Sequence, residues 1–399
     1  MERRQLNISI QGLLVLSLPL GSACSGPGEP PPPVRPGIEV LATDSVHLLD
    51  GLRVGLVTNH TGRTRDGTPS AVALRRAGVD LVALFAPEHG LGGQVTGGES
   101  FGDETEEVTA LPVYSLYGER RSPDGASLQE LDVLVFDVQD FGARYDTYVS
   151  TLFASMEAAA EEDIRFVVAD RTNPIVGRVV QGNVLDPEFA SFVGPYPVPM
   201  RHGMTTGELA RLVDAERGLE ADLHVVPAYG WSRGSWADET GIPWIATSPN
   251  MPTLESAIHY PGTCLFEGTN VSVGRGTDRP FQQLGAPWLD SEALVQALGR
   301  LELPGVRFES VRFTPIEPDD GKYGGIEVQG VRLHVTDRET YDPTATAVAL
   351  LSEMRRQSGQ HWAWRESTFD RLAGTDRLRH AIEADEPVEL IVSHREGRL

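Results

Sequence analysis

The sequence predicts an α/β protein, in which a Rossmann-like domain with an open parallel sheet is followed by a smaller α+β domain. Two observations predict this fold. Short apolar runs alternate with helical segments from Gly51 to Val226, and a mixed pattern of strands and helices follows Pro261. Apolar strands separated by helices are typical of a parallel sheet that is covered on both faces. The 399 residues, 40% of them hydrophobic, suffice for two domains with buried cores.

The first domain is expected to span residues 43–252. Its strands are expected at the short apolar runs 53–57, 81–85, 133–136, 166–169 and 223–226. Helical spacing predicts helices at 70–77, 151–161 and 207–217. Thr205 or Thr206 is positioned to cap the last of these helices, with Glu208 in its first turn.

The second domain is expected to span residues 253–399. Residues 243–261 contain several prolines and have no clear period, so we expect them to cross from one domain to the next. Beyond them, the pattern predicts strands at 306–313 and 326–335, helices at 291–301 and 344–356, and short helical pieces at the end of the chain.

Residues 1–23 have the features of a signal peptide, with Arg3 and Arg4 before an apolar run and small residues before Cys24. We expect Cys24 to be lipidated, although Gly21 stands where a lipoprotein cleavage site usually has Leu. The Pro- and Gly-rich residues 24–42 are expected to form an extended tether. The prediction is an exported protein of the cell envelope, periplasmic or anchored by lipid; cleavage to a free soluble protein is the alternative.

The net charge of −23 argues against nucleic acid as a partner, because phosphates repel an acidic surface. Anionic membrane surfaces are equally unfavourable, so we expect membrane contact only through a lipid anchor. An acidic enzyme can still bind an anionic sugar, provided that Arg or Lys side chains are concentrated at the site.

Polar loops follow four of the predicted strands. Because the carboxyl ends of parallel strands lie at one edge of a sheet, where ligands bind, we expect these loops to form the active site. The candidate side chains in them are Asn59 and His60, Glu88 and His89, Asp137, Asp140 and Arg144, and Asp170, Arg171 and Asn173.

Glu88 is the candidate proton donor. It follows an apolar strand, and a carboxyl group that is partly removed from water retains its proton more readily, as a general acid must near neutral pH. Asp137, at the end of another strand, is the candidate second carboxylate that glycoside hydrolysis usually needs. Asp140 and Asp170 are further candidates, for which a structural role is the favoured interpretation.

A second group of candidates, His202, Glu267 and Arg275, lies in later Gly-rich loops. No P-loop, dinucleotide fingerprint or serine elbow occurs, so we expect no cofactor. The loop histidines lack metal-type spacing, so hydrogen bonds to sugar hydroxyls are expected and a metal site is not. Cys264 is expected to be a buried thiol.

Several segments together resemble one family. They include RVGLVTNHTG, LFAPEHGLGG, LPVYSLYG, LVFDVQDFGARYDTYVSTL, RHGMTTGELA and YPGTCLFEGTNVSVGRGTDRPFQQLGAPW, in that order. They resemble the exo-β-N-acetylmuramidase family known as NamZ, long catalogued as a domain of unknown function. The similarity runs from about Ile38 to near the C-terminus.

This resemblance implies a cleft between the two domains and hydrolysis of terminal, non-reducing β-1,4-linked N-acetylmuramic acid (MurNAc) from peptidoglycan fragments. It implies that Glu88 of the PEHG motif is catalytic. It also implies that the cleft contains His89, Arg144, Asp170, Asn173, His202 and Arg275. This chain has Asp146 where the family usually has an aromatic residue, and Thr172 where it usually has Pro, so substrate preference is left open.

MurNAc carries a lactyl carboxylate, for which the sequence offers Arg144, Arg171, Arg201 and Arg275. Three alternatives stay open: a surface protein that binds muropeptides without cutting them, a metal-dependent envelope hydrolase using His60, His89 and Asp137, and a hydrolase of the same family that prefers another amino sugar because of Asp146.

Overall fold

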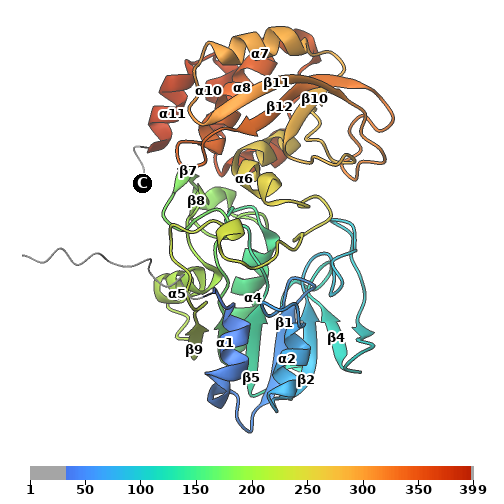
Figure 1. The fold of residues 1–399 in the computed structure, drawn as a ribbon, viewed down its shortest axis with the longest axis vertical. Helices are drawn as coiled ribbons and strands as arrows, with labels where there is room; N and C mark the ends of the chain where they lie inside the picture. Colours follow the sequence, from blue (N-terminus) through green and yellow to red (C-terminus); the bar gives the residue numbers. More distant parts are fainter. Residues whose placement is uncertain (1–32, 397–399) are drawn as a thin grey trace, which may run out of the picture. The chain divides into compact units, whose positions relative to one another are not determined.

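The computed structural model describes residues 33–396, which belong to one compact unit (Figure 1). The predicted signal peptide, Cys24 and the first part of the predicted tether lie outside the described residues. In the described part of the chain, no helix has both the length and the apolar composition needed to cross a membrane.

The N-terminal region is built on a seven-stranded sheet with the order β3-β4-β2-β1-β5-β6-β9, in which only β3 is antiparallel to its neighbour. The strands are β1 Arg53–Thr58, β2 Asp80–Ala86, β3 Glu104–Thr105, β4 Pro112–Ser115, β5 Val133–Asp137, β6 Arg165–Ala169 and β9 Leu223–Val226. The parallel strands follow the Rossmann order, with the reversal between β1 and β5. The predicted α/β fold is confirmed, and within this sheet the sequence pattern missed the short strands β3 and β4.

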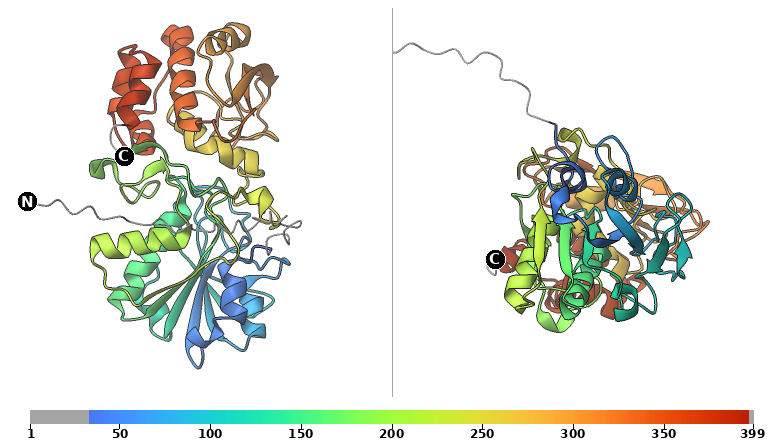
Figure 2. Two further views of the ribbon diagram at one scale, coloured as in Figure 1. Left: turned by 60° about the vertical axis from the view of Figure 1, so that its left-hand side comes forward. Right: turned by 90° about the horizontal axis from the view of Figure 1, so that it is seen from below.

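Helices cover both faces of this sheet, as Figure 2 shows in the view from below. Helices α1 (Gly37–Thr43) and α2 (Ser70–Arg76) pack on one face, and α4 (Thr147–Glu161) and α5 (Thr206–Arg217) on the other. Successive strand residues point to opposite faces, so Leu56 packs with α1 and α2 whereas Val57 packs with α4 and α5. Thr205 caps α5 in a capping box with Glu208, as predicted.

The predicted tether is wrong at its C-terminal end. Residues Gly37–Thr43 form helix α1, and Ile38 and Leu41 are fully buried in the core beside the sheet. Gly37 is needed for this close approach, because a Cβ atom there would lie 2.3 Å from the backbone nitrogen of Asp170. The prolines that precede the helix concealed its short apolar pattern.

The C-terminal region contains a three-stranded antiparallel sheet with the order β10-β12-β11. Its elements are α6 Leu254–Thr263, β10 Gln283–Ala286, α7 Ser291–Gly299, β11 Val306–Phe313, β12 Val328–Val335, α8 Pro343–Ser358, α9 Glu366–Ala373, α10 Arg377–Glu383 and α11 Val388–Glu396. This confirms the predicted smaller α+β part. Helix α6 corrects the expectation of irregular chain up to residue 261, since it extends through Pro261.

The two regions share a hydrophobic core. Phe141, Ile175 and Met200 from the N-terminal region pack in the same cluster as Leu265, Phe281 and Leu350 from the C-terminal region. The hairpin of β7 (Gln181–Val184) and β8 (Pro199–Arg201) lies between the two sheets in Figure 1, together with α6. A continuous core of this kind fixes the two walls of the site described next.

Candidate active site

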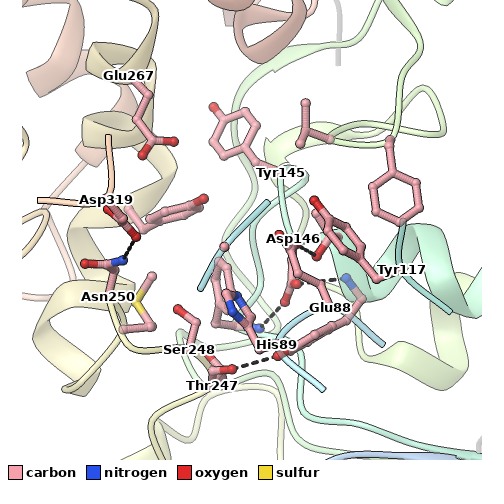
Figure 3. A pocket seen from close by; sticks show the side chains of 18 of the residues that line it. Glu88, His89, Tyr117, Tyr145, Asp146, Thr247, Ser248, Asn250, Glu267 and Asp319 are labelled. Carbon is pink, nitrogen blue, oxygen red and sulfur yellow. Dashed lines mark hydrogen bonds between the residues drawn. The ribbon is translucent and has the colours of Figure 1, made fainter. Parts of the chain in front are cut away.

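A pocket with a volume of about 630 Å³ lies between the two regions (Figure 3). The loops after β2 and β5 and the N-terminus of α4 form one wall, and η4 (Cys264–Gly268) with the loop after β11 forms the other. Its lining includes Glu88, His89, Tyr117, Tyr145, Asp146, Thr147, Tyr148, Asn250, Tyr260, Glu267, Arg275, Phe281 and Asp319. Aromatic surface beside a few polar groups suits a sugar ring.

Glu88 lies directly after β2 and is only 7% exposed. Both of its carboxylate oxygens have partners from this chain. The backbone N–H of Gly98 donates to Oε1 at 2.9 Å, and the Thr147 hydroxyl donates to Oε2 at 2.6 Å. The carboxylate is therefore fixed in orientation where it borders the pocket.

A tight turn presents this carboxylate. The N–H of Gly90 donates to the carbonyl of Pro87, and His89 adopts a φ of 70°, in the left-handed region that non-glycine residues rarely occupy. His89 Nδ1 is 2.8 Å from the carbonyl of Val95, which closes the loop beside Glu88. Backbone strain of this kind is common at functional sites.

Tyrosine side chains surround Glu88. Burial raises the pKa of Tyr117 to about 12, helped by the charge of Glu88 and a hydrogen bond to it. Burial raises the pKa of Tyr148 well above its usual range, and the charges of Asp146 and Glu88 add to the effect. Both phenols are therefore protonated at neutral pH, and the Tyr148 hydroxyl donates to the carbonyl of Thr247 at 2.7 Å.

A second carboxyl group, that of Asp146, also lines the pocket. It caps α4 by accepting the N–H of Tyr148 at 3.0 Å, and it interacts with the buried carboxyl group of Asp140. Burial raises the pKa of both groups, and the charge of Asp140 raises that of Asp146 further. His202 lies behind it, with Nε2 3.5 Å from Asp140, and burial lowers the pKa of His202.

The opposite wall carries an ion-pair network. The guanidinium of Arg275 pairs with Glu267 at 2.5 Å and with Asp319 at 2.9 Å, and Asn250 donates to Asp319 at 2.7 Å. Tyr260 and Phe281 pack edge to face beside it, with ring centroids 4.6 Å apart. This wall therefore offers carboxylate oxygens and aromatic faces to a ligand.

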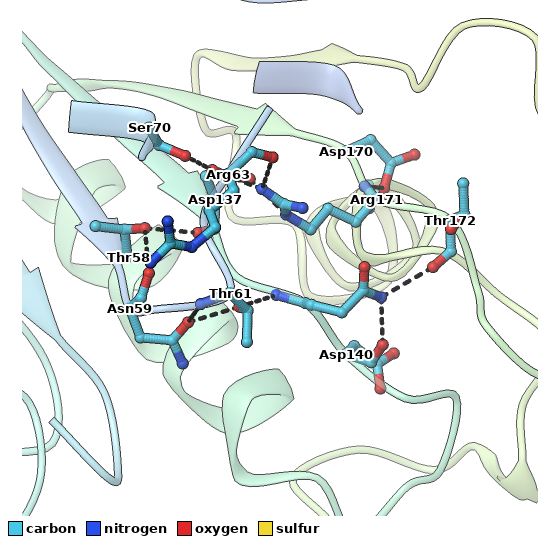
Figure 4. Close-up of polar contacts among 12 residues, drawn as sticks. Thr58, Asn59, Thr61, Arg63, Ser70, Asp137, Asp140, Asp170, Arg171 and Thr172 are labelled. Atoms are coloured by element: carbon cyan, nitrogen blue, oxygen red, sulfur yellow. Dashed lines mark hydrogen bonds and ion pairs between the residues drawn. The ribbon is translucent and has the colours of Figure 1, made fainter. Parts of the chain in front are cut away.

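Figure 4 shows the polar residues at the reversal between β1 and β5. None of the residues labelled there lines the pocket. Arg171 Nε and Nη2 bind the two oxygens of Asp137 at 2.7 and 2.9 Å. Ser70 also donates to Asp137, and the Thr61 hydroxyl donates to Asn59 at 2.6 Å. We call Asn59, Thr61, Ser70, Asp137 and Arg171 the strand-end network.

The strand-end network corrects two predictions. Asp137 is fully buried and Arg171 is 5% exposed, and neither lines the pocket, so Asp137 does not have the position of a second catalytic carboxylate. Asn59 lies outside the pocket for the same reason, with its side-chain oxygen bound to Thr61.

Several further candidates are buried outside the pocket. Asp170 accepts hydrogen bonds from the N–H of Gly207 and the hydroxyl of Thr205, both at 2.8 Å, which joins β6 to α5. Asn173 bonds to the carbonyl of Met204, and His60 to that of Ala246. These side chains, with Asp140 and His202 behind Asp146, shape the site from outside and do not line it.

The buried arginines bind backbone carbonyls. Arg144 donates to the carbonyls of Asn183 and Val198 and, across the two regions, to those of Leu372 and Ala373, at 2.8–3.0 Å. Arg201 likewise donates to the carbonyl of Ile175. Neither lines the pocket, so the prediction that they bind a lactyl carboxylate is wrong, because their guanidinium groups are already engaged in holding the chain together.

The structure thus brings together four of the predicted site residues, Glu88, His89, Glu267 and Arg275. It adds residues that the sequence did not identify: Tyr117, Arg121, Asp319 and Arg371. Asp146 stood out only as a departure from the family. Tyr117 lies just after the missed strand β4, and Asp319 in a Pro-Asp-Asp-Gly turn between two predicted strands, which were weak signals.

Within residues 33–396, no three His, Cys, Asp or Glu side chains are grouped so that they could hold a metal ion. The set that the metal-dependent alternative requires, His60, His89 and Asp137, is therefore not such a group. Cys264 is buried, as predicted, and burial raises the pKa of its thiol.

The fold and the pocket together define an α/β protein with a carboxyl-lined, aromatic pocket at the carboxyl edge of a Rossmann-like sheet. The model of the N-terminal domain of exo-β-N-acetylmuramidase NamZ matches residues 54–255, and that of the C-terminal domain matches residues 258–399. The chain belongs to this family.

Relatives support the assignment along most of the chain. The chain is 42% identical over 370 residues to the peptidoglycan β-N-acetylmuramidase NamZ of Bacillus subtilis (strain 168). The aligned residues make up 92% of this chain and 89% of that protein. Crystal structures of two DUF1343 family proteins from Bacteroides fragilis are similar. One has a TM-score of 0.83 at 36% identity and covers 90% of this chain and 94% of its own. The other has a TM-score of 0.74 at 30% identity and covers 91% and 94%.

Proposed function

We propose that this protein is an exo-acting glycosidase that releases terminal, non-reducing β-1,4-linked MurNAc from peptidoglycan fragments. Membership of the family and 42% identity to a peptidoglycan β-N-acetylmuramidase support this activity. The observation that carries the proposal is Glu88, whose carboxyl group borders a pocket of about 630 Å³ between aromatic side chains.

In the proposed reaction, Glu88 is the general acid. It protonates the oxygen of the bond between MurNAc and the next sugar, and water completes the hydrolysis at the anomeric carbon. Thr147 and Gly98 fix the orientation of the carboxyl group, and the protonated Tyr117 is a further hydrogen-bond donor beside it. The aromatic rings of Tyr145, Tyr260 and Phe281 line the pocket and provide apolar contact with the sugar ring.

Asp146 replaces Asp137 as our candidate for the second carboxyl group. It is the other acidic side chain on the Glu88 wall of the pocket, and it lies beside Thr147, the hydrogen-bond partner of Glu88. Burial and the charge of Asp140 raise the pKa of Asp146, which favours a carboxyl group that can hold a proton next to the sugar.

The Glu88→Gln variant tests the function. We expect kcat on the disaccharide MurNAc-β-1,4-GlcNAc to fall by about 100- to 10,000-fold, because the amide cannot donate a proton in the same way. Glu99→Gln, an exposed residue of the same loop, is the matched control and should stay within about twofold of the parent. Chromatography of the products measures both the activity and the release of free MurNAc.

Three outcomes would contradict parts of the proposal. Undiminished turnover by Glu88→Gln would remove Glu88 as the acid. Binding of the disaccharide with no product from the parent protein would favour the muropeptide-binding alternative. Faster release of another amino sugar from matched glycosides would favour the alternative of a shifted substrate preference within the family.

We further propose that the protein is exported and anchored through a lipid on Cys24. The support is the sequence alone: a positive start, an apolar run and small residues before the cysteine. In a bacterial host, the full chain should fractionate with membranes, and Cys24→Ser should release it in soluble form. Identical fractionation of the two proteins would favour ordinary signal cleavage or no export.

A further inference from the structure

The pocket contains more acidic than basic groups, although the proposed substrate is itself an anion. Its acidic lining residues are Glu88, Asp146, Glu267, Asp319 and Asp320, and its arginines are Arg121, Arg275 and Arg371. A carboxylate ligand would be repelled from this pocket unless one of the guanidinium groups had charge to spare.

The positive charge of Arg275 is already neutralised by neighbouring carboxylates. Its guanidinium group pairs with both Glu267 and Asp319. Burial lowers the pKa of Arg275, but the charges of these two carboxylates outweigh burial and raise it overall. Arg144, Arg171 and Arg201 are buried elsewhere in contacts with carbonyls or with Asp137.

Arg121 lies beyond β4 and keeps its charge available. Its guanidinium carbon is 4.5 Å from the centre of the Phe192 ring, an interaction that positions a cation without neutralising it. Among residues 33–396, no ion pair or side-chain hydrogen bond involves Arg121, whereas its neighbour Arg120 pairs with Asp103 and Asp124. It is exposed on the pocket lining.

Arg371 enters the same pocket from α9, in the C-terminal region. Its Nε donates to the carbonyl of Ser367 one turn earlier at 3.1 Å, which fixes the side chain along the helix. Its two terminal nitrogens have no hydrogen-bond or ion-pair partner in the described part of the chain. Arg121 and Arg371 are thus the pocket arginines with unused donors.

Arg121 is also close to the proposed acid. Its charge acts on Tyr117, where it lowers the pKa against the larger opposite effects of burial and of Glu88. Glu88, Tyr117 and Arg121 line the same pocket, so an anion held by Arg121 would belong to a sugar bound beside Glu88. GlcNAc lacks such an anion, whereas MurNAc carries one on its lactyl group.

We propose that Arg121 and Arg371 are the specificity-determining residues of this pocket and bind the lactyl carboxylate of MurNAc. The inference rests on the proposed function for the identity of the ligand. Arg121 and Arg371 come from the two regions of the chain, so a carboxylate bound by both would also draw the two walls onto the sugar.

The test measures binding in the Glu88→Gln background, so that it does not depend on turnover. Calorimetry compares MurNAc-β-1,4-GlcNAc, its lactyl methyl ester and GlcNAc-β-1,4-GlcNAc with the Arg121→Gln, Arg371→Gln and double variants. Arg300→Gln, an exposed arginine outside the pocket, is the matched control.

We expect each single variant to weaken MurNAc-β-1,4-GlcNAc binding about tenfold or more, because a charge-assisted hydrogen bond is lost. The ester and GlcNAc-β-1,4-GlcNAc should change by less than about twofold, and Arg300→Gln should change none of the three. Arg121→Lys should recover part of the affinity, because it keeps the charge.

Equal losses on the acid and the ester, or no loss on either, would overturn the inference. Failure of the proposed function is a separate result: the parent protein would release no MurNAc even though the arginine variants discriminate acid from ester. Conversely, turnover of MurNAc-β-1,4-GlcNAc that is unchanged in the double variant would overturn only the role of the two arginines.

Discussion

The strand-end network and the pocket are built from the same residue types, yet only one of them is open to a ligand. Both follow the carboxyl ends of neighbouring parallel strands, and both combine carboxylates with a guanidinium group. In the network, both oxygens of Asp137 are bound within the chain by Arg171 and Ser70. In the pocket, Glu88 has one fixed hydrogen bond on each oxygen and faces a cavity.

The difference arises from what covers each region. The segment around residues 237–245 lies over the network and leaves a cavity of only about 40 Å³ beside Thr61 and Arg171. This is close to the volume of a single water molecule in the liquid, about 30 Å³. The crevice where a Rossmann fold usually binds its ligand is therefore filled by the chain itself, and the site is displaced toward β2 and α4. Polar residues at a strand end thus indicate a site only where the tertiary structure leaves room.

The largest expected effect on stability comes from breaking the buried pair in the network. Arg171→Met should lower the free energy of unfolding by about 3–5 kcal/mol, because it leaves the carboxylate of Asp137 buried without its partner. Urea denaturation measures this loss, and kcat at a temperature where the variant is folded should stay close to that of the parent.

Arg53→Met is the matched control, because it breaks the exposed pair with Asp132. It should cost less than about 1 kcal/mol, since water screens an exposed pair. If Arg171→Met instead kept full stability and lost activity, the strand-end network would be part of the active site and not a purely structural region.

The next effect is a pH dependence of stability that originates in Asp170. Burial raises the pKa of this carboxyl group from 3.8 to about 6, against hydrogen bonds from Gly207 and Thr205 that favour the charged form. The folded protein therefore binds a proton between these pH values that the unfolded chain has released. The contribution of Asp170 to stability is largest below pH 3.8 and decreases as the pH rises through 6.

The variant Asp170→Asn cannot titrate, so it isolates this effect. Between pH 4 and pH 7, the parent should lose on the order of 3 kcal/mol of unfolding free energy relative to Asp170→Asn. Denaturation curves of both proteins at several pH values measure the difference. A difference that stays constant, or that moves in favour of the parent as the pH rises, would contradict the buried position of Asp170.

The smallest expected effect concerns Thr147, which lines the pocket beside Glu88. Thr147→Val removes the hydroxyl that donates to Glu88 but keeps the shape of the side chain. We expect kcat/KM to fall by about tenfold and the unfolding free energy to change little, because the carboxyl group of Glu88 loses a hydrogen bond that fixes its orientation. Thr147→Ser should restore most of the activity. A Ser variant as poor as the Val variant would show that Thr147 acts through packing.

The sequence predicted most of the central sheet and the longer helices that cover it. The runs that form β1, β2, β5 and β6 are apolar over most of their length because both faces of the central parallel strands are buried, and this composition is visible without a structure. The same order of elements placed Glu88 at the end of a strand. Helix α1 and strand β4 were missed because they are short and lie among prolines and polar residues, where periodicity is weak.

Tertiary structure alone decided which polar residues at the strand ends face the pocket. Asp137 and Glu88 both follow apolar strands in the sequence, and nothing local to Asp137 reveals that Arg171 and Ser70 will enclose it. The choice depends on contacts between residues far apart in the chain, such as Arg144 with Leu372 or Thr147 with Glu88. Where such contacts enclose a carboxylate, as at Asp137, it is structural. Where they leave it facing a cavity, as at Glu88, it is available for catalysis.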